Sequence, residues 1–108
     1  MKLEHSLDPA RQTLRVTIPG DLLSTSLVDI RAELMELILP TTDSWSELEM
    51  DLTASKMIDS MGLNLMVSVI RIVGGRGGKV SALVRNQVVY RLFLFTRLDK
   101  HLRLVLVK

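Results

Sequence analysis

The stretch 47–63 reads ELEMDLTASKMIDSMGL and passes from the pattern of a strand to that of a helix. Residues 47–52 alternate acidic and apolar side chains, which predicts a half-buried strand. A loop follows at 53–59, and an apolar helix is predicted from Ser60 to Val73. Asp59 and Ser60 both stand where a side-chain oxygen can accept from the free N–H groups of a first helical turn. The stretch is therefore a strand–loop–helix unit, typical of α/β proteins.

Strands and helices alternate on both sides of this unit. Alternating or β-branched runs predict four further strands, at 3–7, 14–18, 79–84 and 102–107. Asp8-Pro9 is the expected turn between the first two strands. The order ββαβαβαβ implies βαβ crossovers, so we expect an α/β fold with a mostly parallel sheet in a single domain spanning 1–108.

Two more helices are predicted from apolar spacing and capping residues. The first is capped by Ser24 or Ser26 and ends before Pro40, and a polar loop follows at 41–46. The second is capped by Asn86 and runs through Phe95. The glycine-rich stretch 74–78 is expected to end the helix that begins at Ser60, because glycine tolerates the left-handed conformation found at helix ends.

Composition excludes several classes of protein. The chain has 108 residues, 47% of them hydrophobic and none of them cysteine. The length suits one domain with one core, and the lack of cysteine excludes disulfide scaffolds, thiolate metal sites and cysteine catalysis. The most apolar run, 63–73, covers 11 residues, whereas a membrane span needs about 20. With no signal-peptide pattern, we expect a soluble, cytoplasmic protein without a membrane span.

Charge is distributed unevenly along the chain. Residues 1–55 hold 4 basic and 10 acidic side chains, whereas residues 56–108 hold 10 basic and 2 acidic ones. This asymmetry marks a nucleic-acid or acidic-partner surface in some proteins, and in others the two halves fold into one sheet and partly neutralise each other. The basic residues are dispersed, and the aromatic residues are too few for base-stacking platforms. We therefore expect no direct contact with nucleic acid.

Motifs for catalysis, cofactors and metals fail when they are tested. The glycine-rich stretch before Lys79 has Val73 and Val80 where a phosphate-binding loop needs glycine and Ser/Thr. His5 and His101 are the only histidines, and neither has a second histidine one helical turn away. No G-x-S-x-G elbow is present. The sequence predicts a protein that is not an enzyme and holds no cofactor or metal.

The Asp59-Ser60 pair allows two interpretations. Plain helix capping explains the pair, and burial within the fold explains why residues 63–70 of the helix behind it carry no charge. Alternatively, the loop lies at the carboxyl edge of a parallel sheet, where α/β folds place binding sites, and the apolar helix meets a partner.

Several segments together resemble the STAS domain family of anti-sigma factor antagonists. Residues 50–53 and 58–63 are similar to its D-L-S…I-D-S-S-G-L signature. The strand 14–18 with Gly20-Asp21 is similar to the family's first long strand and G-E-L-D turn, and 77–80 to its G-G turn. The family's P-x-V-x-x-L-x-x-T-G-L-D helix is matched between Asn86 and Asp99 at Val88, Leu92, Thr96, Leu98 and Asp99.

The resemblance implies a STAS fold, with a small mixed, mostly parallel sheet of four to five strands flanked by about three helices. It implies a binding module whose partner is an anti-sigma factor of the ATPase-kinase type, which phosphorylates Ser60 and thereby releases itself. A PP2C-type phosphatase would reverse the modification. The resemblance does not decide whether the chain forms a homodimer. We expect the partner to contact eight residues: Asp21, Leu22, Leu23, Met57, Asp59, Ser60, Met61 and Asn64.

The sequence also departs from the family pattern. Met61 replaces the second serine of the motif, Asn64 replaces a small residue, and the acidic residue expected three positions after Gly20 is missing. Arg97 replaces the glycine of the T-G-L-D turn. Two rival functions therefore remain: an unphosphorylated STAS subunit of a transporter or signalling complex, and a small-ligand binder.

Overall fold

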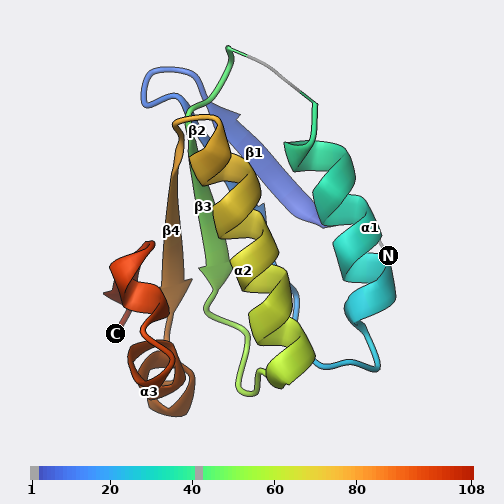
Figure 1. Cartoon of the computed structure of the whole chain (residues 1–108), viewed down its shortest axis with the longest axis vertical. Helices are drawn as coiled ribbons and strands as arrows, with labels where there is room; N and C mark the ends of the chain where they lie inside the picture. Colours follow the sequence, from blue (N-terminus) through green and yellow to red (C-terminus); the bar gives the residue numbers. More distant parts are fainter. Residues whose placement is uncertain (1–2, 41–42) are drawn as a thin grey trace.

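The computed structural model describes residues 3–40 and 43–108, and within them one five-stranded sheet forms. The strands lie in chain order: β1 (Glu4–Asp8), β2 (Thr13–Thr17), β3 (Glu47–Leu52), β4 (Lys79–Val84) and β5 (Arg103–Leu106). β1 pairs antiparallel with β2, and β2 to β5 are parallel (Figure 1). The predicted mixed, mostly parallel sheet is confirmed.

The crossovers between the parallel strands are α1 (Leu27–Ile38), α2 (Ser60–Gly75) and α3 (Gln87–Phe95), the last followed by a short 3-10 helix, η1 (Leu98–Lys100). Right-handed crossovers that always step in the same direction along a sheet place their helices on the same face. Figure 1 shows α1 and α2 side by side in front of the strands, and α3 packs against β4 and β5. The predicted order of elements is confirmed, and only η1 was missing from it.

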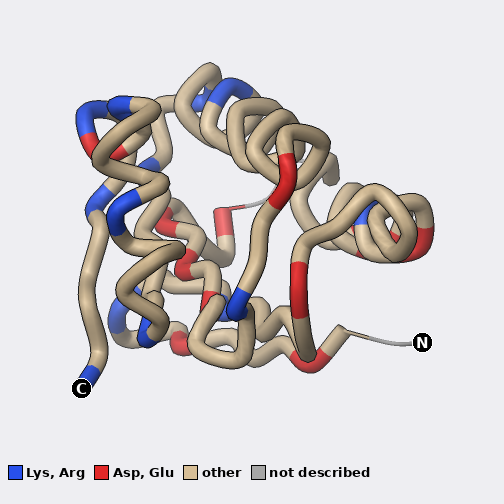
Figure 2. Tube along the Cα trace, turned by 90° about the horizontal axis from the view of Figure 1, so that it is seen from below, with Lys and Arg blue, Asp and Glu red and all other residues tan. Residues whose placement is uncertain are grey.

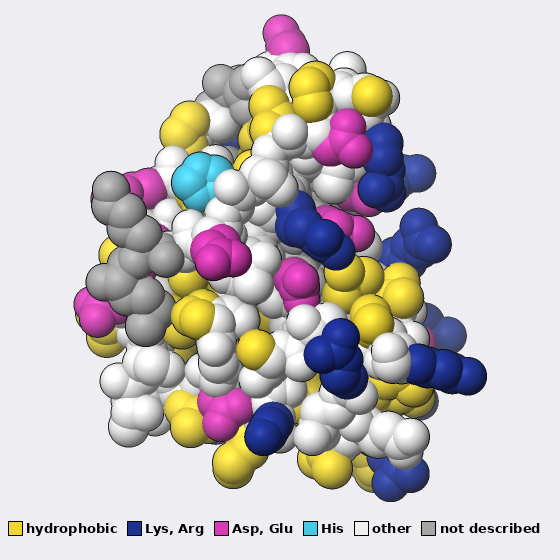
Figure 3. All heavy atoms as spheres, turned by 180° about the vertical axis from the view of Figure 1, so that it is seen from behind, with side chains coloured by type: hydrophobic (Ala, Val, Ile, Leu, Met, Phe, Trp, Pro, Cys, Tyr) yellow, Lys and Arg dark blue, Asp and Glu magenta, His cyan; other side chains and the backbone are white. Residues whose placement is uncertain are grey.

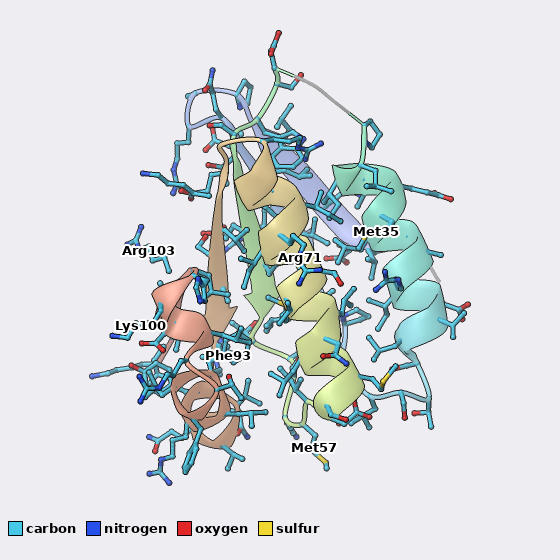
Figure 4. All side chains as sticks on the ribbon, viewed as in Figure 1. Met35, Met57, Arg71, Phe93, Lys100 and Arg103 are labelled. Carbon is cyan, nitrogen blue, oxygen red and sulfur yellow. The ribbon has the colours of Figure 1, made fainter. Side chains whose placement is uncertain are left out.

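The core lies between this face of the sheet and the helices. Alternate strand residues such as Val16, Met50 and Ala82 are fully buried there. They meet apolar helix residues, among them Leu34 and Phe93, whose side chain points inward from α3 (Figure 4). No helix formed by residues 3–40 and 43–108 covers the opposite face of the sheet. Figure 3 shows charged side chains of both signs on it, so this face is solvated.

The apolar α2 is covered mainly by its own fold. Its buried residues are Gly62, Leu65, Met66, Val69 and Val73, whereas Met61, Asn64 and Arg71 are exposed. The helix also continues to Gly75, two residues beyond its predicted end. The chain turns only afterwards, where Gly77 has a φ of 78°. Burial within the fold thus explains most of the missing charge on this helix.

Two local predictions need correction. Ser26 stands at the N-cap of α1, but its hydroxyl donates to the carbonyls of Leu23 and Asp21 and caps nothing. The segment expected to be a polar loop contains Trp45, which is buried and lies 5.2 Å from the Arg76 guanidinium. Residues 41 and 42 of that loop lie outside the described part of the chain.

The two halves of the chain share one sheet, but no close ion pair joins them among the residues that the structure describes. Within the described residues the one ion pair joins Arg15 to Glu49 at 2.8 Å, and both belong to the acidic half. Figure 2 shows most Lys and Arg residues on the side of the C-terminus. None of the described helices is long and apolar enough to span a bilayer.

Candidate functional site

Two loops lie together at the carboxyl ends of β2 and β3. The Leu22 N–H donates to the Met57 carbonyl at 3.1 Å, and the Asp59 N–H donates to the Leu22 carbonyl at 3.1 Å. Leu22 and Ile58 thus form a parallel bridge beyond the ends of the named strands. The loop before α1 and the loop before α2 are therefore held against each other by backbone hydrogen bonds.

Side chains strengthen this contact from both loops. The Asp21 carboxylate accepts from the N–H groups of Lys56 at 2.7 Å and Met57 at 3.1 Å. In the opposite direction, the fully buried Ser55 hydroxyl donates to the Gly20 carbonyl at 2.6 Å. Each loop satisfies polar backbone groups of the other, so the loops form one structural unit.

The Asp59 carboxylate connects this unit to α2. Its Oδ1 accepts from the Gly62 N–H at 2.9 Å, which caps the helix, and its Oδ2 accepts from the Ser24 N–H at 2.7 Å. These two backbone donors, Ser24 first, stabilise the charged form and lower the pKa of Asp59 below its ordinary value of 3.8. Asp59 is therefore ionised at neutral pH and positions the first turn of α2.

Gly62 is required by the close approach of the two loops. A Cβ at this position would overlap the Leu22 carbonyl oxygen and would lie 2.8 Å from Cγ2 of Ile58. Any side chain here would push the loop before α1 away from the start of α2. Close packing of the two loops thus explains why glycine stands at this position of the 58–63 motif.

Ser60 is the first residue of α2 and is exposed to solvent. Two large apolar side chains flank it, since Met57 is 60% exposed and Met61 is 54% exposed. Asn64 is exposed one turn further along the helix. Figure 4 shows Met57 at the tip of the loop that leads into α2. A hydroxyl group thus stands in an accessible, partly apolar surface at a helix N-terminus.

The predicted site residues divide into surface and supporting residues. Four of them are exposed and lie close together in the chain: Met57, Ser60, Met61 and Asn64. Asp21, Leu23 and Asp59 are partly buried. The prediction that a partner contacts Leu22 needs correction, because its side chain is fully buried and only its backbone holds the two loops together.

Sequence reasoning missed Ser55 and the backbone of Ser24 as parts of this site. Each forms a hydrogen bond with a residue 35 positions away in the chain, and no local sequence pattern predicts such contacts. Over residues 3–40 and 43–108, no group of three or more His, Cys, Asp or Glu side chains is arranged to hold a metal ion.

Comparison with known proteins finds similarity at the level of structure. No family model matches the chain, and no curated protein matches it. An anti-sigma factor antagonist from Mycobacterium paratuberculosis is 19% identical, with a TM-score of 0.76 over 96% of this chain and 86% of the other. TM1081 from Thermotoga maritima is 15% identical, with a TM-score of 0.83 over 97% of this chain and 86% of the other.

A third similar structure is the Bacillus cell fate determinant SpoIIAA in its phosphorylated form. It is 17% identical, with a TM-score of 0.68 over 95% of this chain and 90% of the other, and the unphosphorylated form is also similar. This chain has the STAS fold. The expected fold class is confirmed, and at these identities the likeness concerns the fold alone.

The turn after α3 contains a residue in the left-handed conformation. Arg97, which replaces the glycine that the resemblance expects there, has a φ of 62° and lies in the left-handed region. The turn thus keeps the glycine conformation without the glycine. A residue with a side chain adopts this conformation only at some cost in local strain.

Proposed function

We propose that this chain is an anti-sigma factor antagonist, a binding module and not an enzyme. Its partner is an anti-sigma factor with serine kinase activity, bound while Ser60 is unmodified and released when Ser60 is phosphorylated. The observation that carries the proposal is the exposed Ser60 hydroxyl directly after the fixed Asp59, on a fold that solved anti-sigma factor antagonists share.

The surface around Ser60 suits binding in the unmodified state. The side chains of Met57 and Met61 offer exposed apolar area on both sides of the hydroxyl. Asn64 adds an amide that can donate and accept at the edge. The methionine side chain is flexible and adapts its shape to a partner at little strain. This surface can therefore form a close contact without a deep pocket.

Phosphorylation would change this surface without unfolding the domain. A phosphate adds a charge of about −1.5 to −2 at neutral pH, and it would stand next to the ionised Asp59. The domain itself tolerates an anion there, because the N-terminus of α2 favours negative charge. A partner packed on Met57 and Met61 would have to bury the added charge, and the complex would dissociate.

The partner enzymes follow from the same proposal. A kinase of the ATPase type would transfer the terminal phosphoryl group of ATP to the Ser60 oxygen, and a PP2C-type phosphatase would remove it by hydrolysis. Both steps, and the sigma factor that the cycle controls, belong in the cytoplasm, where transcription takes place.

The first test is the intact mass of the protein purified from its native host, measured before and after phosphatase treatment. We expect a shift of one phosphate that maps to Ser60 and disappears in Ser60→Ala. Ser6→Ala, which alters an exposed serine of β1 outside this site, is the control and should keep the shift. The absence of phosphate under every growth condition would overturn the switch.

The second test is capture of partners from lysate of the native host. We expect Ser60→Ala to retain a kinase-type partner and Ser60→Asp to retain at least about tenfold less, a difference of about 1.4 kcal/mol in binding free energy. Equal capture by both variants would exclude control through Ser60.

One observation favours a second candidate function, a fixed STAS subunit of a larger complex. Val67 and Ile70 on α2 are only half-buried, and with Leu98 and His101 they line an open hollow of about 310 Å³. In that case Val67→Asp would abolish assembly, whereas substitutions of Ser60 would change little.

A further inference from the structure

The outward face of α3 is apolar and has no partner among the described residues. Val88 is 69% exposed, and Phe95, two helical turns further along, is 88% exposed. Leu92 lies between them. Together with Met57 and Ile58 of the loop before α2, this face lines a hollow of about 390 Å³. Apolar surface of this kind on a small domain marks an interaction site.

The rim of the α3 hollow is basic. Lys56 and Arg91 line it, one from the loop and one from the helix. Neither forms an ion pair with an acidic side chain within residues 3–40 and 43–108. A partner that matches both the apolar lining and the basic rim of this hollow must therefore carry apolar side chains together with carboxylates.

Such a surface exists on the same molecule, on the outward face of α1. Val28 is 79% exposed and Leu39 is 56% exposed, and Ala32 and Met35 stand between them at intervals of three or four residues. This spacing places the four residues in one stripe along the helix, away from the core residues on its other side. We call it the α1 stripe: Val28, Ala32, Met35 and Leu39.

The α1 stripe has acidic neighbours. Asp29 and Glu36 follow Val28 and Met35 directly in the helix and stand beside the stripe. Arg31 borders the stripe on its other side, so one flank is acidic and the other carries a single basic residue. An amphipathic helix with apolar residues at these intervals and an acidic flank has the form that binds an apolar groove with a basic rim. The acidic half of the chain thus offers a helix, and the basic half offers a groove of complementary charge.

One molecule cannot bring these two surfaces together. α1 lies at one side of the fold and α3 at the other, with α2 between them (Figure 1). We propose that the α1 stripe of one copy binds the α3 hollow of a second copy. The contact joins two different surfaces, so it leaves one free stripe and one free hollow in each dimer and extends to rings or chains. Because Met57 belongs both to this hollow and to the surface proposed around Ser60, a partner bound at Ser60 and a second copy would compete for it.

Sedimentation velocity tests the assembly on the full chain, from roughly 10 µM to roughly 1 mM. We expect dimers and longer species that grow with concentration and decrease at about 0.5 M salt, because the charged rims are then screened. A monomer at every concentration in low salt would overturn the proposal.

Two variants test the head-to-tail geometry. Phe95→Asp disables the hollow and Val28→Asp disables the stripe, so each variant alone should be monomeric. An equimolar mixture should form a one-to-one dimer and nothing longer, because each variant keeps the surface that the other lacks. A mixture that stays monomeric, or either variant assembling alone, would contradict this geometry.

Leu7→Asp is the matched control, since Leu7 is an exposed apolar residue of β1 outside both surfaces. It should assemble as the unmodified chain does. Circular dichroism checks that each variant is folded, and should an aspartate variant unfold, Phe95→Ser and Val28→Ser take its place in the same mixing experiment.

Discussion

The carboxylate of Asp59 accepts the backbone N–H of Ser24 at 2.7 Å, although the two residues are 35 positions apart. Its other oxygen accepts from Gly62 within α2. One side chain therefore fixes the start of α2 against the loop before α1. The exposed Ser60 follows directly on this fixed residue, which would hold its hydroxyl in place within the partner surface proposed above.

Asp59→Asn should make the free energy of unfolding less dependent on pH in the acidic range. The folded pKa lies below the ordinary value of 3.8, so the carboxylate stabilises the fold fully above that value and loses its effect as pH falls through the folded pKa. At pH 7 the variant should unfold at a lower urea concentration than the parent. The gap should narrow as the pH falls below about 3.8, and urea midpoints measured down to about pH 2.5 would show it.

The control for Asp59→Asn is Thr25→Ala, which alters an exposed residue of the loop before α1 that does not titrate. The difference between its urea midpoint and that of the parent should be small and the same at every pH. A gap for Asp59→Asn that stays constant from pH 7 to acid would show that the charge of the carboxylate contributes nothing.

Gly62→Ala and Gly74→Ala should have opposite effects on stability, although both glycines lie in α2. At position 62 the new methyl group meets the Leu22 carbonyl, and the loop must shift, which should cost about 1–3 kcal/mol. At position 74 nothing lies within 4 Å of the new methyl group. There the better helix propensity of alanine should add about 0.5–1 kcal/mol. Urea unfolding measures both, and equal effects would contradict the close approach at Gly62.

Local patterns were sufficient to predict most of the fold. β3 and β4 have the predicted bounds, because their alternation of side chains reflects one buried and one solvated face. Asn86 caps α3 as expected, with its side-chain oxygen accepting from Val88 and Val89. These features are decided by residues within a few positions of each other.

Contacts between distant residues could not be predicted in this way. Leu22 belongs to a turn that looks exposed in sequence, but the bridge to Ile58 buries it. Trp45 lies in a stretch of polar residues and is nevertheless buried. The candidate site was inferred from Asp59 and Ser60, whereas the loop contacts that hold these residues depend on the three-dimensional arrangement.

Ser55→Ala should destabilise the domain by about 1–3 kcal/mol, because the hydrogen bond from the Ser55 hydroxyl to the Gly20 carbonyl is lost. Alanine has no group that could donate to this carbonyl in its place. Thr25→Ala, an exposed residue in the opposite loop, should change the urea midpoint little. Hydrogen exchange should also become faster in both loops of the Ser55 variant. If Ser55→Ala and Thr25→Ala behave alike, the bond between the loops does not support the site.

Arg97→Gly should stabilise the domain. Arg97 has a φ of 62°, and a left-handed conformation costs a residue with a side chain about 1–2 kcal/mol. Glycine adopts it freely but gains about 0.5–1 kcal/mol of extra conformational freedom when unfolded, so the net gain should be about 0.5–1 kcal/mol. The matched control is Arg71→Gly in the regular part of α2, which should lose about 1 kcal/mol in the same urea titration. A loss of stability at position 97 as well would mean that the Arg97 side chain makes contacts that outweigh the strain of its backbone.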